Sequence, residues 1–146
     1  MNILVGIDLS DCTDTIVKKT LEFSKVLAAK VWLLHVAEPE PDFVGYDVGP
    51  QYERDVLAEK FHLEHTEIQA IANNFRTEGL DATALLVRGA TVDTILNEAA
   101  KLEADIVVVG SHGRGALQRL LVGSVSEGIL RHAKCPILII PTHKHA

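Results

Sequence analysis

Five short runs of apolar residues constrain the fold of this chain more than any other feature. The runs are rich in β-branched residues and mostly continuous, whereas a strand with one solvated face would alternate apolar and polar residues. Continuous runs of this length are typical of strands that are covered on both faces, as in a parallel sheet. They occupy residues 3–7, 31–37, 82–87, 106–109 and 137–140.

Helical patterns fill the four intervals between these runs. Ser10 and Thr91 are candidate N-caps, and Gly79 is a candidate stop for a second helix over residues 51–78. A fourth helix is predicted over residues 124–132. Strands that alternate with helices predict a parallel sheet with helices on both faces. The sequence contains no stretch typical of an interdomain linker, so we expect a single domain that spans all 146 residues.

The composition is that of a globular protein. Apolar residues make up 47% of the chain and charged residues 23%, and the formal net charge is −6. A negative protein disfavours nucleic acid and anionic membranes as partners, and no apolar stretch approaches the roughly 18 residues that span a bilayer. Cys12 and Cys135 lie far apart without metal-binding spacing. Because the N-terminus also lacks a basic leader, we expect a cytoplasmic protein with free thiols.

A glycine-rich stretch follows the fourth apolar run. Gly110, Gly113 and Gly115 lie within six residues, and their missing side chains allow a ligand to approach the backbone closely. Gly123 and Ser124 then begin a helix, whose first amides have no acceptor within the helix and favour an anion. The spacing by itself predicts an anion or phosphate site, and it matches neither a Walker A loop nor the dinucleotide-binding fingerprint. A simple chain reversal, with Ser124 as a helix cap, is the alternative.

The same stretch resembles the ATP-binding motif of the universal stress protein family. The motif is Gly110, two residues, Gly113, nine residues, and then Gly123 and Ser124. The resemblance covers essentially the whole chain. The further residues that are similar to the family are 3–10, 104–110 and 131–141.

The resemblance implies a Rossmann-like α/β fold, with an open sheet of five parallel strands in the order 3-2-1-4-5. Strands 1 and 4 then separate at the topological switch point, where open α/β sheets bind ligands. Asp8 follows the first strand and Gly110 ends the fourth. We therefore expect the two candidate sites to converge on one crevice.

The resemblance also implies a role for each residue of an adenine-nucleotide site. Asp8 and the Gly110 carbonyl would hold the ribose, and the backbone of Val36 would pair with the adenine edge. The other implied residues are Gly6 and Val109 at the base, Gly113, Gly123, Ser124, Val125 and Ser126 at the phosphates, and His112, Arg114 and Gly115 in the loop beside them. The implied ligand is ATP, ADP or AMP, with magnesium or manganese bridging the phosphates.

Simpler interpretations stay open for several of these residues. They are Asp8 as a cap of the following helix, Val36 as a plain core residue, and His112 and Arg114 as polar loop residues. Gly6 departs from the proline that many members of the family carry. We expect this departure to loosen that wall of the adenine pocket.

The resulting hypothesis is an ATP-binding regulatory or signalling module of the stress response rather than an enzyme. No paired carboxylates are placed to hold two metal ions, and no strong hydrolytic apparatus is visible. A slow ATPase, or a phosphoryl or nucleotidyl transferase that uses His112 or Arg114, is the alternative. A flavin-binding electron carrier and a family member that has lost its ligand are further alternatives.

The last apolar run predicts a protein partner. In the implied strand order it is an edge strand without a charged residue, and such an edge pairs with other chains unless it is covered. The resemblance implies a homodimer, in which the same strand of a second subunit covers it. The strand consists of Ile137, Leu138, Ile139 and Ile140. We also expect a downstream protein partner that the sequence does not identify.

Two remaining stretches are less informative. The segment from Glu38 to Pro50 is long for a connection between strand and helix, and the resemblance is weakest there. A functional loop and a disordered one are equally open. His62 and His65 on the second predicted helix favour a solvated helix face over a metal site.

Overall fold

The computed structural model describes residues 1–37, 50–112 and 123–142. In these residues, strands and helices alternate along the chain, and the bounds of the strands and of the second and fourth helices lie within one residue of the predicted ones. The elements are β1 (Asn2–Gly6), α1 (Thr13–Leu27), β2 (Lys30–Ala37), α2 (Pro50–Thr77), β3 (Asp81–Arg88), α3 (Thr91–Lys101), β4 (Ile106–Gly110), α4 (Ser124–His132) and β5 (Ile137–Ile140).

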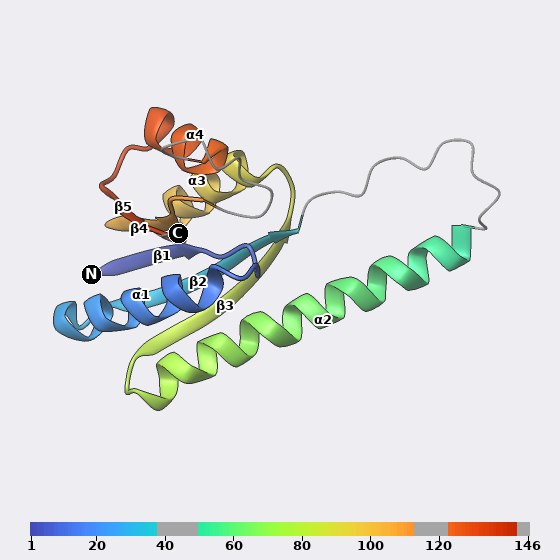
Figure 1. Ribbon diagram of the computed structural model, residues 1–146, viewed down its shortest axis with the longest axis horizontal. Helices are drawn as coiled ribbons and strands as arrows, with labels where there is room; N and C mark the ends of the chain where they lie inside the picture. Colours follow the sequence, from blue (N-terminus) through green and yellow to red (C-terminus); the bar gives the residue numbers. More distant parts are fainter. Residues whose placement is uncertain (38–49, 113–122, 143–146) are drawn as a thin grey trace, which may run out of the picture.

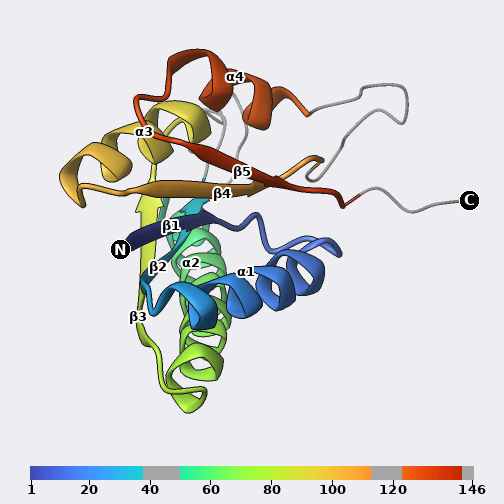
Figure 2. The same cartoon turned by 90° about the vertical axis from the view of Figure 1, so that its left-hand side faces the viewer.

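The strands form one parallel sheet in the order β3-β2-β1-β4-β5, which confirms the predicted topology. Helices α1 and α2 cover one face of the sheet, and α3 and α4 cover the other (Figures 1 and 2). The central strand β1 shows why the apolar runs are continuous. Val5 is buried in the core under α1 and α2, and its neighbour Leu4 is buried in the core under α3 and α4.

Two predicted helix caps are wrong by one or two residues. The N-cap of α1 is Cys12 and that of α3 is Ala90, whereas the sequence pattern favours Ser10 and Thr91. The Ser10 hydroxyl donates to the Asp8 carboxylate at 2.6 Å and accepts from the Cys12 N–H at 3.3 Å, in a turn that precedes the helix. The side chains around the end of β1 therefore form a local structure of their own.

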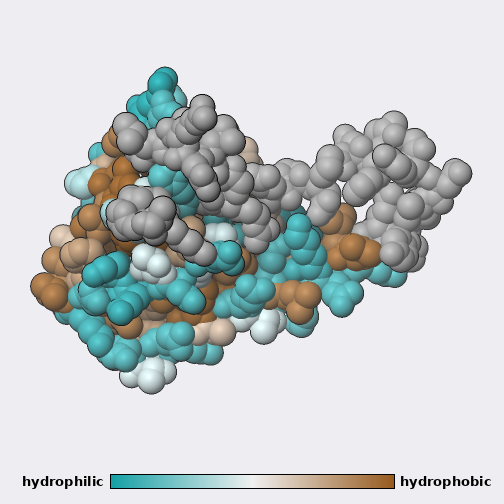
Figure 3. Space-filling view, viewed as in Figure 1, coloured by the Kyte–Doolittle hydropathy of each residue, from teal (hydrophilic) through white to brown (hydrophobic). Residues whose placement is uncertain are grey.

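Helix α2 is 28 residues long, and its first turns run beyond the sheet (Figure 1). It ends before Gly79, which takes a φ of +87°, a left-handed conformation that favours glycine, as predicted for a stop. The visible surface of α2 is mostly hydrophilic with scattered apolar spots (Figure 3). In the part of the chain that the structure describes, no helix has the length and apolar character needed to cross a bilayer.

Candidate functional site

The neighbouring strands β1 and β4 separate at their carboxyl ends. Their ladder ends at the pair Val5–Val108, whereas β1 continues along β2 as far as Gly6–Leu34. One residue later, the Ile7 N–H still donates to the Leu34 carbonyl at 2.8 Å. The chain therefore leaves β4 while it still follows β2, as expected at the topological switch point of an open α/β sheet.

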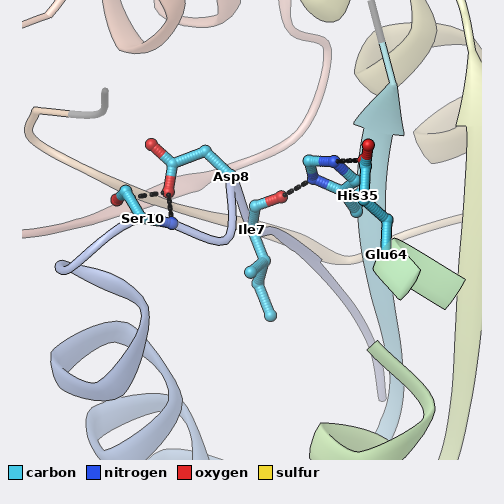
Figure 4. A network of polar contacts seen from close by, with 5 residues as sticks. All are labelled: Ile7, Asp8, Ser10, His35 and Glu64. Carbon is cyan, nitrogen blue, oxygen red and sulfur yellow. Dashed lines mark hydrogen bonds and ion pairs between the residues drawn. The ribbon is translucent and has the colours of Figure 1, made fainter. Parts of the chain in front are cut away.

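The turn after β1 places Asp8 at this split. Its Oδ1 accepts hydrogen bonds from the Ser10 N–H at 3.0 Å and from the Ser10 hydroxyl at 2.6 Å (Figure 4). Leu9, between them, has a φ of +57°, a left-handed conformation that costs a residue with a Cβ about 1–2 kcal/mol. Such strained residues cluster at functional sites. Asp8 thus shapes the turn without capping α1, and its contact with a ribose stays a prediction.

At the end of β4, the two ends of the glycine motif lie together. The Gly123 N–H donates to the Ser111 carbonyl at 2.6 Å, and a Cβ on Gly123 would lie 3.0 Å from the same oxygen. The buried hydroxyl of Ser126 donates to the Gly110 carbonyl at 2.5 Å. The start of α4 therefore packs closely against the end of β4. The motif residues outside the described part of the chain are Gly113, Arg114 and Gly115.

Helix α4 begins at this point with open amides. Its N-cap is Gly123, which has no side chain to cap the helix. The first amides, those of Ser124, Val125 and Ser126, have no acceptor within the helix. The positive end of the helix dipole adds to their attraction for an anion. Because Gly123 is the N-cap, the interpretation of Ser124 as a simple cap is wrong.

The contact between Ser126 and Gly110 bears on two predicted roles. The Ser126 hydroxyl is expected at the phosphates, and the Gly110 carbonyl is expected at the ribose. In this structure the Ser126 hydroxyl donates to the Gly110 carbonyl. The amide of Ser126 remains directed along the helix axis with those of its neighbours. Ser124, whose side chain is exposed, is the hydroxyl at this helix start that faces solvent.

A hydroxyl just beyond β5 holds the residues that follow β4. Thr142 Oγ1 accepts from the His112 N–H at 3.0 Å and donates to the His112 carbonyl at 2.8 Å. The Thr142 N–H donates to Ser111 Oγ at 2.9 Å, and Ser111 Oγ lies 3.1 Å from His112 Nδ1. These bonds fix the backbone that leads into the glycine loop. No motif points to Thr142, because it lies 30 residues from its partner.

The residues predicted to line the base have their side chains in the core under α3 and α4. Val36 and Val109 are both buried there, so the interpretation of Val36 as a core residue is confirmed for its side chain. A Cβ on Gly6 would lie 3.3 Å from Val109 Cγ1 and 3.3 Å from Ile95 Cδ1. These side chains take up the space beside Gly6, so the looser wall expected there is not seen among the described residues.

The backbone of Val36 faces the split, and the sheet sets its direction. The Leu34 carbonyl accepts from Ile7 on the β1 side, and the Ala37 carbonyl accepts from Gly89 on the β3 side. Because successive residues of a strand point their backbone groups to opposite neighbours, the N–H and carbonyl of Val36 point to the β1 side. Strand β1 has already ended at that level.

A buried polar pair lies beside the split, and the sequence predictions do not include it. His35 Nδ1 lies 2.8 Å from the Ile7 carbonyl oxygen, and His35 Nε2 contacts Glu64 Oε2 of α2 (Figure 4). The side chains of His35 and Glu64 are only 11% and 15% exposed. The available signal is a single histidine within the apolar run 31–37, where a buried polar side chain needs a partner.

Metal-ligating side chains are not clustered in the part of the chain that the structure describes. No group of three or more His, Cys, Asp or Glu residues there could hold a metal ion. His62 and His65 are exposed on α2, and His65 Nε2 lies 3.4 Å from Gln69 Nε2.

Known proteins resemble this chain over almost its whole length. The universal stress protein family matches residues 1–141. A universal stress protein from the QAH/OAS sulfhydrylase 3′ region of Thermus aquaticus is 31% identical over 144 residues, which cover 94% of this chain and 96% of that protein. Among solved structures, hypothetical protein MJ0577 superposes with a TM-score of 0.84 at 24% identity, covering 99% of this chain and 97% of that chain.

Two further solved structures are nucleotide complexes with the same fold. A universal stress protein in complex with cAMP is 23% identical, with a TM-score of 0.68, and the match covers 98% of both chains. A universal stress protein from Archaeoglobus fulgidus in complex with dAMP is 22% identical, with a TM-score of 0.63, and the match covers 96% of this chain and 98% of that chain. The family match and the strand order together show that the chain belongs to the universal stress protein family.

Proposed function

We propose that this chain is an ATP-binding regulatory module whose nucleotide lies across the split between β1 and β4. The observation that carries the proposal is a pair of contacts beside the open N-terminus of α4, across the split from Asp8: Gly123 bonds the Ser111 carbonyl, and Ser126 bonds the Gly110 carbonyl. One side offers backbone amides to an anion, and the other offers a carboxylate that can accept from ribose hydroxyls.

Glycine is needed on the β4 side because a side chain there would push the elements apart. A Cβ on Gly110 would lie 2.8 Å from Ile16 Cδ1 and 3.0 Å from Thr142 Cγ2. Gly110 therefore lets Ile16 of α1 and Thr142 approach the end of β4, and Gly123, on which a Cβ would lie 3.0 Å from the Ser111 carbonyl oxygen, does the same for α4. The amides of Ser124 and Val125 then lie beside the end of β4, where they would hold the phosphates. Asp8 would hold the ribose, and the backbone of Val36 would hold the adenine edge.

The two nucleotide complexes of related proteins support an adenosine phosphate as the ligand. Their ligands, cAMP and dAMP, share an adenine ring and a phosphate. Magnesium or manganese would bind through the phosphate oxygens of ATP, because hard divalent ions prefer oxygen ligands. Such an ion would neutralise part of the phosphate charge and leave the protein amides to orient the chain of phosphates.

The role that we propose is binding rather than catalysis, and the backbone of His112 has a structural task in the site. Its N–H and its carbonyl both bond Thr142, and its ring lies beside Ser111. A bound nucleotide would stabilise the folded protein by mass action and order its surface for a partner in the stress response. Slow ATP hydrolysis is the alternative, and the variant His112→Ala tests it. A hydrolysis rate that falls while affinity is kept would favour the enzyme.

The direct test of the proposal is the small molecule that the purified protein carries. Protein purified without added nucleotide is denatured, and the released molecules are identified by chromatography and mass spectrometry. Calorimetric titration of emptied protein then compares ATP, ADP and AMP, with GTP as the control. We expect an adenine nucleotide to be released or to bind with micromolar affinity. The proposal would be contradicted if no adenine nucleotide is released from the purified protein and none binds to the emptied protein.

We further propose a homodimer through β5. The strand is an edge of the sheet, and Ile137, Leu138 and Ile139 remain half-buried in the single chain. An apolar hollow of about 290 Å³ lies beside it and is also lined by Phe23 and Leu27 of α1, which are 44% and 39% exposed. A second copy aligned along this edge would bury this apolar surface.

Sedimentation at micromolar concentration tests the homodimer. We expect the mass of two chains, and the mass of one chain would contradict the proposal. Phe23→Lys places a charge in the hollow and should weaken the association. Val26→Lys places the same charge on an exposed residue of α1 that does not line the hollow, so it should leave the association unchanged.

A further inference from the structure

We propose that His35 and Glu64 hold one shared proton, and that this proton-dependent bridge positions the Ile7–Asp8 corner and leaves the Val36 amide available to the nucleotide. His35 would act as a positioning residue, because it touches the backbone that carries the site rather than the ligand. The proposal rests on the proposed function only in its last step, the effect on nucleotide affinity.

The acceptor on one side of His35 determines where a proton must be. A carbonyl oxygen has no proton to donate, so His35 Nδ1 must carry the N–H that bonds the Ile7 carbonyl at 2.8 Å. On the other side, His35 Nε2 contacts a carboxylate oxygen of Glu64. A neutral ring with its proton on Nδ1 presents a lone pair at Nε2, which an ionised carboxylate repels. The contact therefore requires one more proton, on Nε2 or on Glu64.

Cationic side chains lie on β3 and α2, the elements next to this pair. The register of the strands places Arg88 on the same face of the sheet as His35. The Arg88 guanidinium lies 4.5 Å from the centre of the Phe61 ring, one turn before Glu64 on α2, and Lys60 also precedes Glu64 by one turn. Both cations attract a negative charge at Glu64.

The other elements around the pair are β1 and α1. The ionisable group that follows β1 is Asp8, and its carboxylate is turned toward Ser10 (Figure 4). From α1, Ile16 and Val17 pack on this core with apolar side chains. Asp8 is therefore linked to the pair through the backbone of Ile7, whose carbonyl is directed at His35.

The bridge also changes the hydrogen bonding of the sheet at the split. In a continuing parallel ladder, the Ile7 carbonyl would accept from the Val36 N–H. Here it accepts from His35 Nδ1, and the bond from Ile7 to Leu34 is the last backbone bond between β1 and β2 in the described residues. The Val36 N–H is thus left facing the split, where we propose that the adenine edge binds.

Removal of the shared proton breaks one of the two bonds of His35. A neutral His35 beside an ionised Glu64 can donate to the Ile7 carbonyl or to Glu64, but not to both. Either α2 loses its contact with the end of β1, or the Ile7 carbonyl becomes available to Val36. In both cases we expect nucleotide affinity to fall as the pH rises through this transition.

The variant Glu64→Gln separates the proton from the contact. A glutamine amide donates to Nε2 of a neutral ring, so it keeps both bonds of His35 without the extra proton. Between about pH 5 and about pH 8, we expect the affinity of the unmodified protein for ATP to fall by about 3- to 10-fold, the value of one hydrogen bond. Glu64→Gln should keep the low-pH affinity throughout, and Glu64→Ala should be weak throughout. Glu67→Gln, an exposed position on the same helix, should behave as the unmodified protein.

Nitrogen-15 NMR of the histidine rings in nucleotide-free protein tests the bridge by itself. At low pH we expect His35 to carry a proton on Nδ1 together with a second, shared proton that Glu64→Gln abolishes. A neutral ring protonated only on Nε2 at low pH would overturn the bridge, even if nucleotide binds. An equal decline of affinity with pH in Glu64→Gln would overturn the link to the site. A bridge seen by NMR without any nucleotide binding would support the bridge and contradict the proposed function instead.

Discussion

The two sides of the split in the sheet are built from different groups. On the β1–β2 side, ionisable side chains determine the geometry: Asp8 shapes a strained turn, and the pair His35–Glu64 bonds the Ile7 carbonyl and α2. On the β4–β5 side, backbone groups and uncharged hydroxyls determine it: Gly123 packs against the Ser111 carbonyl, and the hydroxyls of Ser126 and Thr142 bond the backbone at the end of β4.

This difference matches what the two parts of a nucleotide require. A chain of phosphates has negatively charged oxygens that point in several directions. Several amides at a helix start can bind these oxygens without a specific side chain. A ribose and a base present single hydrogen-bonding groups, which need acceptors and donors in fixed places. The account therefore predicts two kinds of loss in ATP affinity. On the β1 side, affinity should fall most when a polar side chain is removed, and on the β4 side it should fall most when a glycine gains a side chain.

The largest effect on the β1 side is expected from Asp8→Ala. The loss of a hydrogen bond to a charged group should lower ATP affinity by about 10- to 100-fold in calorimetric titration. Asp8→Asn is the matched control, since its amide oxygen can still accept from the Ser10 N–H and keep the turn. An Asp8→Ala protein that folds and binds ATP with unchanged affinity would show that Asp8 has only its local role.

A smaller loss, of about tenfold, is expected from Gly123→Ala on the β4 side. The new Cβ would lie 3.0 Å from the Ser111 carbonyl, so the start of α4 must shift by a few tenths of an ångström and its amides with it. A tenfold loss corresponds to about 1.4 kcal/mol. Gly128→Ala is the control, because its Cβ would meet Val92 at 2.9 Å, away from the helix start. It should lower the melting temperature and leave ATP affinity unchanged, and equal losses of affinity in both variants would contradict the account.

The smallest effect on binding is expected from Thr142→Val. This change removes the hydroxyl that bonds both backbone groups of His112 and should lower the free energy of unfolding by about 1–3 kcal/mol. ATP affinity should fall only a few-fold, because Thr142 holds the backbone of His112 and is not proposed to touch the ligand. Thr142→Ser keeps the hydroxyl and should restore both quantities. A larger loss of affinity than in Asp8→Ala would reverse the order of the two sides.

The strands and the β4 side of the site could be predicted from the sequence because their signals are local. Each strand is a continuous apolar run, and Gly110 and Gly123 belong to a motif of recognisable spacing. The contacts of His35 with Glu64 and of Thr142 with the end of β4 join residues 29 and 30 positions apart. No periodicity or spacing connects such residues, so the side-chain part of the site emerges only when the chain is folded.

The central claim is that the two sides of the split form one nucleotide site, and amide NMR during a titration with ATP tests it most directly. The account predicts that the amide signals of Asp8 and Val36 and those of Ser124 and Val125 shift together, with one dissociation constant. Shifts confined to one side, or no shifts on either side at saturating ATP, would contradict it.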